Sequence, residues 1–237
     1  MQRWPKAPKI VFFTAPNSFQ DEIIQRFSVD LGVPVISMNN MYNVISEYAG
    51  KHEEYSHPFY LKAKEMIDAG DIDQQLKDKL ALKLLRISNV GRDGFILKDF
   101  PRVVQEAEML EEFRGGMNSF VHLSLPDDIM VQIEQSKHAC NHCGRQYYSE
   151  TIQSEEQGIY IEPFLPEDGH CFDCGSRDIT PSGEPSVIEE VLKTYKSQKD
   201  ELLGFYDHLG LLVDFDIKHG YEDYEKIKDQ IQFNIKH

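Results

Sequence analysis

Short apolar runs alternate with longer amphipathic stretches along most of this chain. The strand-like runs occupy 9–14, 33–37, 94–97, 120–125 and 211–216. The stretches with helical periodicity occupy 18–31, 39–88, the residues after Pro101, 127–137, 185–206 and the residues from Tyr221. Strands separated by helices are typical of a parallel sheet with helices on both faces. The pattern therefore predicts an α/β fold of three layers.

One segment breaks this alternation. Residues 138–183 are rich in Gly, Pro and Cys and show neither strand-like apolar runs nor helical periodicity. We therefore expect an irregular insert in the α/β domain. The domain is then made of 1–137 and 184–237, with the insert at 138–183 between its two halves.

Composition and charge narrow the classes of partner. The 237 residues carry a formal net charge of −15, which opposes binding to nucleic acid and would repel a free triphosphate unless basic residues gathered locally. No apolar run approaches the roughly 18 residues that span a bilayer, so we expect no direct membrane insertion. The basic stretch Met1–Lys9 leaves little room for a cleavable presequence before the first strand.

The four cysteines give the strongest chemical signal. They form two CxxCG motifs, separated by 27 residues, at Cys140, Cys143, Cys171 and Cys174. Four thiolates at this spacing predict a tetrahedral, structural Zn²⁺ site. A catalytic zinc using nearby histidines (His138, His142, His170) and a redox dithiol are the alternatives. Because no cysteine is left for a disulfide, we expect an intracellular protein.

Three landmarks together resemble a known family. TAPNSFQDE follows the first strand at 14–22, GFILKDFPR spans 94–102, and the cysteine-rich insert precedes a long helix. In this order they resemble adenylate kinases with a long, zinc-containing LID. The resemblance covers about residues 9–235. It implies a P-loop nucleoside monophosphate kinase-like CORE, an AMP-binding helical subdomain at 38–70 and a LID at 138–183.

The phosphate loop departs from the pattern of that family, GxPGxGKGT. Phe19 adds bulk where backbone would approach a ligand, Gln20 replaces the lysine, and Glu22 replaces the hydroxyl that binds Mg²⁺. We expect a capping box from Ser18 to Asp21 at the start of the helix, with Asp21 and Glu22 placing negative charge in the anion site. We predict that Lys98, which stands where the family has a carboxylate, pairs with Asp21 or Glu22. The alternative is a solvated Lys98.

The phosphate-binding arginines that the resemblance implies are mostly replaced. They align with Asn43, Gln132, Lys137, Thr180 and Val191. Arg102 alone matches an AMP-phosphate arginine, although it could equally bridge the strand end and the next helix. The adenine-reading glutamine aligns with Glu106. Arg177 could substitute for a lost arginine, but a salt bridge to Asp178 is the expected use, so no basic cluster is predicted.

These observations lead to the hypothesis of a pseudoenzyme. It would be an adenylate kinase-like, catalytically inactive subunit of a larger protein assembly, with structural Zn²⁺ and without ATP or Mg²⁺. Its partners would be other protein subunits, in a mitochondrial, ciliary or cytoskeletal complex. The alternative is a nucleotide sensor or weakly active adenylate kinase, supported by Arg102, Lys137 and Arg177. A zinc module that contacts RNA ranks last because of the acidic charge.

Overall fold

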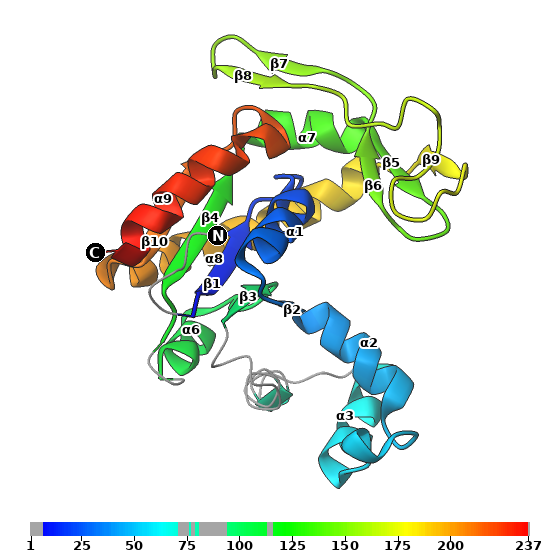
Figure 1. Ribbon diagram of the computed structural model, residues 1–237, viewed down its shortest axis with the longest axis vertical. Coiled ribbons are helices and arrows are strands. Elements are labelled where there is room, and N and C mark those ends of the chain that lie inside the picture. The colour runs from blue at the N-terminus through cyan, green and yellow to red at the C-terminus, as the bar shows by residue number, and fades with distance from the viewer. Residues whose placement is uncertain (1–6, 71–75, 77–78, 81–93, 113–115, 237) are drawn as a thin grey trace.

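A five-stranded parallel sheet forms the centre of the molecule in a computed structural model, which describes residues 7–70, 76, 79–80, 94–112 and 116–236 (Figure 1). Its strand order is β10-β4-β1-β3-β2. The strands are β1 (Lys9–Thr14), β2 (Val35–Ser37), β3 (Phe95–Lys98), β4 (Ser119–Ser124) and β10 (Leu212–Asp216). Within it β1 lies between β3 and β4, with Ile10 opposite Ile96 and Ser119. The predicted parallel sheet is confirmed.

Helices cover both faces of this sheet. In Figure 1, α1 (Gln20–Leu31) and α9 (Tyr224–Lys236) lie in front of it and α8 (Pro185–His208) lies behind it. Two further helices in the described part of the domain, α6 (Val104–Glu111) and α7 (Asp127–Gln135), both pack against α8. The predicted last helix begins later than Tyr221, because a short 3-10 turn, η2 (Gly220–Asp223), precedes it. Sheet and helices give the predicted three layers.

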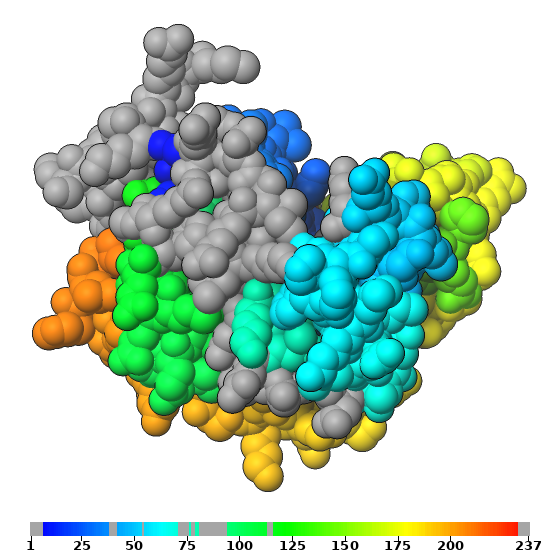
Figure 2. Space-filling model, turned by 90° about the horizontal axis from the view of Figure 1, so that it is seen from below, coloured from blue at the N-terminus to red at the C-terminus, as the bar shows by residue number. Residues whose placement is uncertain are grey.

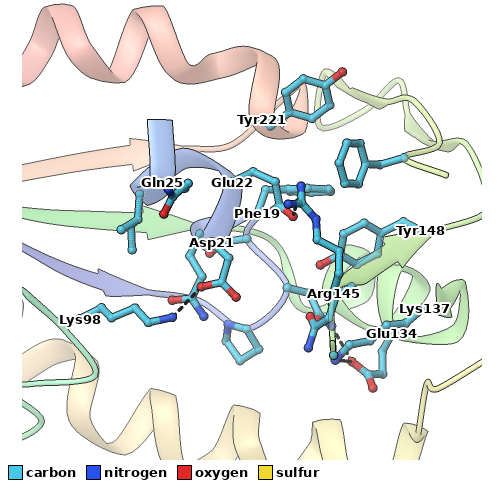
Figure 3. A pocket seen from close by; sticks show the side chains of 18 of the residues that line it. Phe19, Asp21, Glu22, Gln25, Lys98, Glu134, Lys137, Arg145, Tyr148 and Tyr221 are labelled. Carbon is cyan, nitrogen blue, oxygen red and sulfur yellow. Dashed lines mark hydrogen bonds and ion pairs between the residues drawn. The ribbon is translucent and has the colours of Figure 1, made fainter. Parts of the chain in front are cut away.

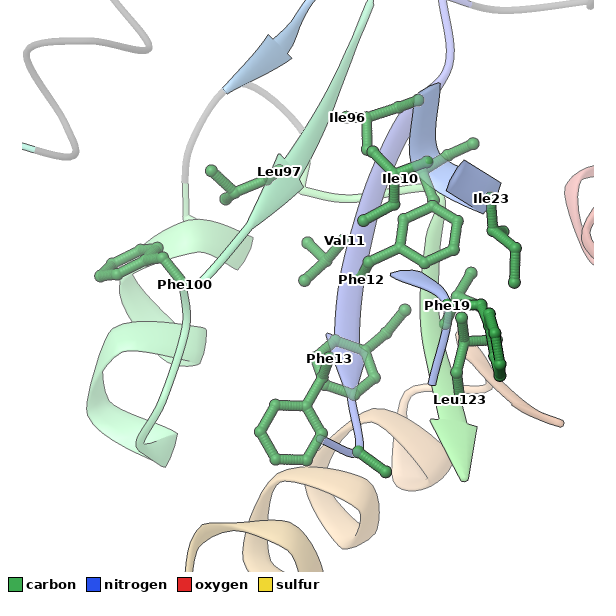
Figure 4. Packing of buried hydrophobic residues seen from close by; sticks show 14 of the residues in the cluster. Ile10, Val11, Phe12, Phe13, Phe19, Ile23, Ile96, Leu97, Phe100 and Leu123 are labelled. Atoms are coloured by element: carbon green, nitrogen blue, oxygen red, sulfur yellow. The ribbon is translucent and has the colours of Figure 1, made fainter. Parts of the chain in front are cut away.

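The core is continuous because the strands are apolar on both faces. Ile10, Val11 and Ile96 are fully buried, as a strand covered on both sides requires (Figure 4). The ring of Phe120 stacks on that of Tyr206 from α8 with 3.9 Å between centroids. Burying one such aromatic side chain contributes roughly 1.5–3 kcal/mol, so the sheet is a firm platform for the loops at its end.

A helical arm projects from the edge strand β2. It consists of α2 (Met38–Tyr48), η1 (Glu53–Tyr55) and α3 (Pro58–Asp68), and α2 packs against α3. In the space-filling view from below, the cyan atoms of α3 lie between the green part of the chain and the yellow insert (Figure 2). The helical periodicity over 39–88 corresponds in its described part to the helices of this arm, which Gly50 at φ 79° and Pro58 separate. Residues 71–75 and 81–88 lie outside the described residues.

The insert is more ordered than the sequence suggested. Its five short strands are β5 (Lys137–Cys140), β6 (Gln146–Tyr148), β7 (Ile152–Ser154), β8 (Ile159–Ile161) and β9 (Ile179–Pro181). They form a three-stranded sheet, β6-β5-β9, and a β7–β8 hairpin. The expectation of an irregular insert is therefore wrong: strands this short leave almost no periodic signal in the sequence. Among the helices that the structure describes, none is long and apolar enough to cross a membrane.

Candidate nucleotide cleft and cysteine cluster

The loop after β1 turns sharply into α1. Asn17 and Phe19 both have φ 58°, a left-handed conformation that Asn tolerates and that is unusual for Phe. Asn17 therefore behaves as expected. The predicted capping box is wrong, because Phe19 takes the N-cap position and makes no side-chain cap hydrogen bond. The Ser18 hydroxyl is buried and finds no hydrogen-bond partner in the described part of the chain.

Phe19 is buried between elements that lie far from it in the sequence. Its side chain is 2 % exposed, and its ring lies 5.0 Å from that of Tyr148 in β6 of the insert. On the other side it faces Gly220, where an added Cβ would lie 3.5 Å from the ring. Phe19 thus packs the phosphate-loop region, the insert and the segment before α9 against one another.

A large cleft opens at the carboxyl end of the parallel sheet. Its volume is about 1210 Å³, and α1, the insert and the start of α8 contribute to its walls. Figure 3 shows charged side chains lining it from several elements. The carboxyl ends of strands in an open α/β sheet are where such folds place ligands. The cleft is therefore the candidate functional site.

Lys98 at the end of β3 forms the predicted ion pair. Its ammonium Nζ lies 2.7 Å from Oδ1 of Asp21 in the first turn of α1 (Figure 3). Of the two predicted partners, Asp21 and Glu22, it is thus Asp21 that pairs with Lys98. The Asp21 side chain is 60 % exposed, so solvent weakens the pair, and such pairs contribute at most about 1 kcal/mol.

Arg145 reaches the same cleft from the insert. Its guanidinium lies 2.6 Å from Asp173 and 3.9 Å from Glu22, and it also lies over the Phe164 ring at 5.5 Å. Burial raises the pKa of Glu22, and the charges of Asp21 and Asp173 raise it further, against the opposing effect of Arg145. Arg145 is a site residue that the sequence analysis missed. Its position directly after Cys143-Gly144 was the available signal.

Lys137 supplies a third cation at the entrance to the insert. Its Nζ lies 3.3 Å from Oε2 of Glu134, and this carboxylate also accepts a hydrogen bond of 2.9 Å from the Asn17 side chain. The other Glu134 oxygen accepts from the backbone N–H of Glu184. With Arg26 from α1, four cations line the cleft, and the four carboxylates of Asp21, Glu22, Glu134 and Asp173 line it as well. The cations are therefore balanced by acids and do not form a net basic cluster among the described residues. Lys98, Lys137 and Arg145 lie far apart in the sequence and share a cleft only in the fold.

The two remaining arginines of interest do not join this group. Arg102 lines a smaller neighbouring cavity of about 420 Å³, and its Nε donates to the carbonyl of Asp99. Its backbone N–H donates to Glu106, so it bridges strand end and helix as the alternative reading proposed. Arg177 donates to Nε2 of His170 at 2.8 Å. The predicted salt bridge to Asp178 is therefore wrong, because Asp178 instead accepts from Asn141.

The four cysteines of the insert meet at one point. The sulfurs of Cys140, Cys143, Cys171 and Cys174 all lie within 4.8 Å of one another. Two of the separations are 3.6 Å, between Cys140 and Cys174, and 3.4 Å, between Cys143 and Cys171. Thiolates about 2.3 Å from a tetrahedral zinc lie about 3.8 Å apart, so the arrangement is compatible with a metal such as zinc.

The two cysteine motifs share one backbone geometry, which explains the meeting of their sulfurs. Gly144 and Gly175 have φ 78° and 71° and donate to the carbonyls of Cys140 and Cys171. Only glycine adopts this conformation without strain, which accounts for the glycine that closes each motif. Tyr147, fully buried, donates its hydroxyl hydrogen to Sγ of Cys171 at 3.1 Å. The positions of the four sulfurs are thus fixed by the two CxxCG turns and by Tyr147 of β6.

Comparison with known proteins identifies relatives over most of the chain. A probable adenylate kinase 1, chloroplastic, from Oryza sativa is 29% identical over 217 residues, which are 89% of this chain and 70% of that protein. An adenylate kinase from Archaeoglobus fulgidus is 26% identical over 94% of this chain and 95% of its own length. One from Thermodesulfovibrio yellowstonii is 28% identical over 86% and 89%. No family model matches the chain.

These relatives contradict the pseudoenzyme interpretation. Each carries the name of a kinase, an enzyme that transfers phosphoryl groups, and the matches extend across nearly the whole chain. The replacements counted in the sequence were measured against one expected set of cations, whereas the fold places Lys98 and Arg145, which are outside that set, in one cleft with Lys137. The expectation that ATP and Mg²⁺ are not used loses its support with that interpretation.

Proposed function

We propose that this chain, which is similar to adenylate kinases over most of its length, belongs to their family, binds adenine nucleotides in the cleft and transfers a phosphoryl group between them at a low rate. Both nucleotides would enter with the carboxyl ends of β1 and β3 at one side and the insert at the other. The magnesium ion would arrive as part of the nucleotide substrate.

One observation carries this proposal: Lys98, Lys137 and Arg145 line the same cleft. They come from β3, β5 and the turn after Cys143, so they surround the cleft instead of forming one patch. Phosphoryl transfer requires positive charge placed around the phosphate oxygens, and little covalent chemistry by the protein. In the proposal the three side chains bind those oxygens, and Arg145 closes over them from the insert.

The carboxylates beside these cations explain why the rate would be low. Asp21, Glu22, Glu134 and Asp173 each pair with one of the three. A polyphosphate must displace these partners before it gains the cations, and the displaced carboxylates then repel it. Binding is therefore weaker than in a cleft whose cations are free.

Calorimetric titration with ATP, AMP and a bisubstrate analogue that joins two adenosines through phosphates tests the proposal. We expect micromolar binding of the analogue and weaker binding of each nucleotide, because the analogue fills both halves of the cleft. The matched variants are Lys98→Met, which removes a cleft cation, and Lys193→Met, which removes an exposed cation on the outer side of α8. Failure of the wild-type protein to bind the analogue at millimolar concentration would refute the proposal.

The cysteine cluster supports a second element of the proposal. Cys140, Cys143, Cys171 and Cys174 hold a structural Zn²⁺ that fixes the segment 138–183 as a LID, beside an AMP-binding arm at 38–70. The sulfur separations and the two glycine turns support this assignment. Structural zinc of this kind contributes about 10–16 kcal/mol of apparent binding free energy, enough to order a segment with a small core. Here that core is Cys140, Tyr147 and Cys171.

The protein's setting in the cell stays a prediction. We propose that other proteins bind this chain, as the acidic surface and the enlarged insert suggested. A mitochondrial, ciliary or cytoskeletal location remains part of that proposal. The word chloroplastic in the names of two plant relatives describes those proteins.

A further inference from the structure

Three aromatic rings form a continuous surface beside the cysteine cluster. The Phe164 ring lies 5.5 Å from that of Phe172 and 5.5 Å from that of Tyr221. We name these three residues the aromatic patch. Phe172 is 56% exposed and Tyr221 is 39% exposed, while Phe164 is half-buried between them. The patch thus joins the insert to η2, with its outer rings open to solvent.

The exposure of Phe172 needs an explanation. It lies between Cys171 and Cys174, in a turn whose backbone is fixed by hydrogen bonds, so its side chain cannot retreat into the core. Its ring also meets that of Tyr147 at 5.7 Å, which holds it in place. A rigid aromatic side chain held out in solvent loses little entropy when a partner covers it, and contiguous exposed apolar residues mark interaction sites.

Negative charge surrounds the patch. Between residues 146 and 176 the chain has seven Asp or Glu residues and neither Lys nor Arg. Glu162, Glu167 and Asp173 are exposed and lie within three residues of Phe164 or Phe172 in the sequence. Glu222 follows Tyr221 and is also exposed. Carboxylates around aromatic rings favour a partner that carries cations.

Arg145 shows what kind of cation this surface accepts. Its guanidinium lies over the Phe164 ring at 5.5 Å and bonds Asp173 at 2.6 Å. One planar cation thus uses a ring face and a neighbouring carboxylate together, which a guanidinium does better than an ammonium. We infer that the aromatic patch docks an arginine-containing, basic segment of a partner protein, with further guanidinium groups on Phe172 and Tyr221. Phe164 and Tyr221 also line the nucleotide cleft, but the inference concerns a protein partner and is tested in the absence of nucleotide, so its failure is distinguishable from failure of the proposed function.

Fluorescence anisotropy with the full, zinc-loaded chain tests the inference. The probe is a short labelled peptide of alternating arginine and glycine, and its control is the same peptide with lysine for arginine. At physiological ionic strength we expect the arginine peptide to bind at least about threefold more tightly, because guanidinium stacks on rings and ammonium does so less well. Equal affinity for both peptides, or no binding of either, would overturn the inference.

Variants separate the patch from general acidity. Phe172→Ser and Tyr221→Ser should each weaken binding of the arginine peptide about tenfold, as expected for an aromatic anchor at an interface. Leu209→Ser, which removes the 44% exposed apolar side chain at the end of α8, should leave it unchanged. Phe172→Ser could weaken binding by disturbing the fold of the insert. Tyr221 lies outside the cysteine motifs, so Tyr221→Ser tests the patch without that risk. Wild-type affinity in the Tyr221 variant would contradict the inference.

Discussion

Removing the charge of Glu22 should strengthen nucleotide binding. Glu22 lies in the first turn of α1 and is 14% exposed, facing the cleft beside Arg145. A carboxylate ~4 Å from a phosphate opposes it by about 1 kcal/mol in water and about 4 kcal/mol at the effective dielectric of a protein surface. Glu22→Gln keeps the shape of the side chain and removes that repulsion. The substitution also removes the ion pair of Glu22 with Arg145, whose guanidinium still pairs with Asp173.

The expected gain in ATP affinity therefore lies between about fivefold and several hundredfold. Isothermal titration of wild type and variant with ATP measures it. Glu155→Gln is the matched control, because Glu155 is an exposed residue between β7 and β8. If Glu22→Gln and Glu155→Gln both bind ATP as wild type does, the carboxylates of α1 do not govern the cleft and the reasoning is refuted.

The remaining predictions concern stability and the other site residues. The pKa of Glu22 is raised in the folded protein, so ionising Glu22 lowers the stability of the fold as pH rises. Glu22→Gln should therefore raise Tm at pH 7, and the difference from wild type should disappear below about pH 4.5. A difference in Tm that is independent of pH in thermal scans would contradict this. Phe19→Ala should lower the unfolding free energy by about 3–5 kcal/mol in urea denaturation, because Phe19 is buried against Tyr148; a loss under about 1 kcal/mol would count against its packing role. Lys98→Met should change stability by less than about 1 kcal/mol yet weaken ATP binding about tenfold. Cys143→Ser should abolish stoichiometric zinc in elemental analysis and lower Tm, and full zinc content in that variant would exclude Cys143 as a ligand.

The sequence predicted the sheet, because its strands are buried on both faces and read as continuous apolar runs. Ile10, Val11 and Ile96 carry that signal. The ion pair of Lys98 was also predictable, since parallel strand ends meet at one edge and the two charge changes were complementary. The cysteine cluster followed from its spacing, because each CxxCG turn is a local structure.

The cleft itself was not predictable in the same way. Lys137 and Arg145 line the same cleft as Lys98 only because of the path of the insert, and no local pattern records that path. The packing of Phe19 was not predictable either, because Tyr148 and Gly220 come from the insert and from η2 and no local pattern places them beside this loop. A count of replaced residues along one motif therefore misjudged a site that side chains from several elements build.

Conversion of ADP into ATP and AMP by purified protein would demonstrate phosphoryl transfer in the cleft. We expect slow turnover that co-elutes with the protein in gel filtration, falls in Lys98→Met and is unchanged in Lys193→Met. Chromatographic separation of the three nucleotides measures it. The account is contradicted if the wild-type protein produces no ATP from ADP, or if the activity is the same in Lys98→Met and therefore belongs to a contaminating kinase.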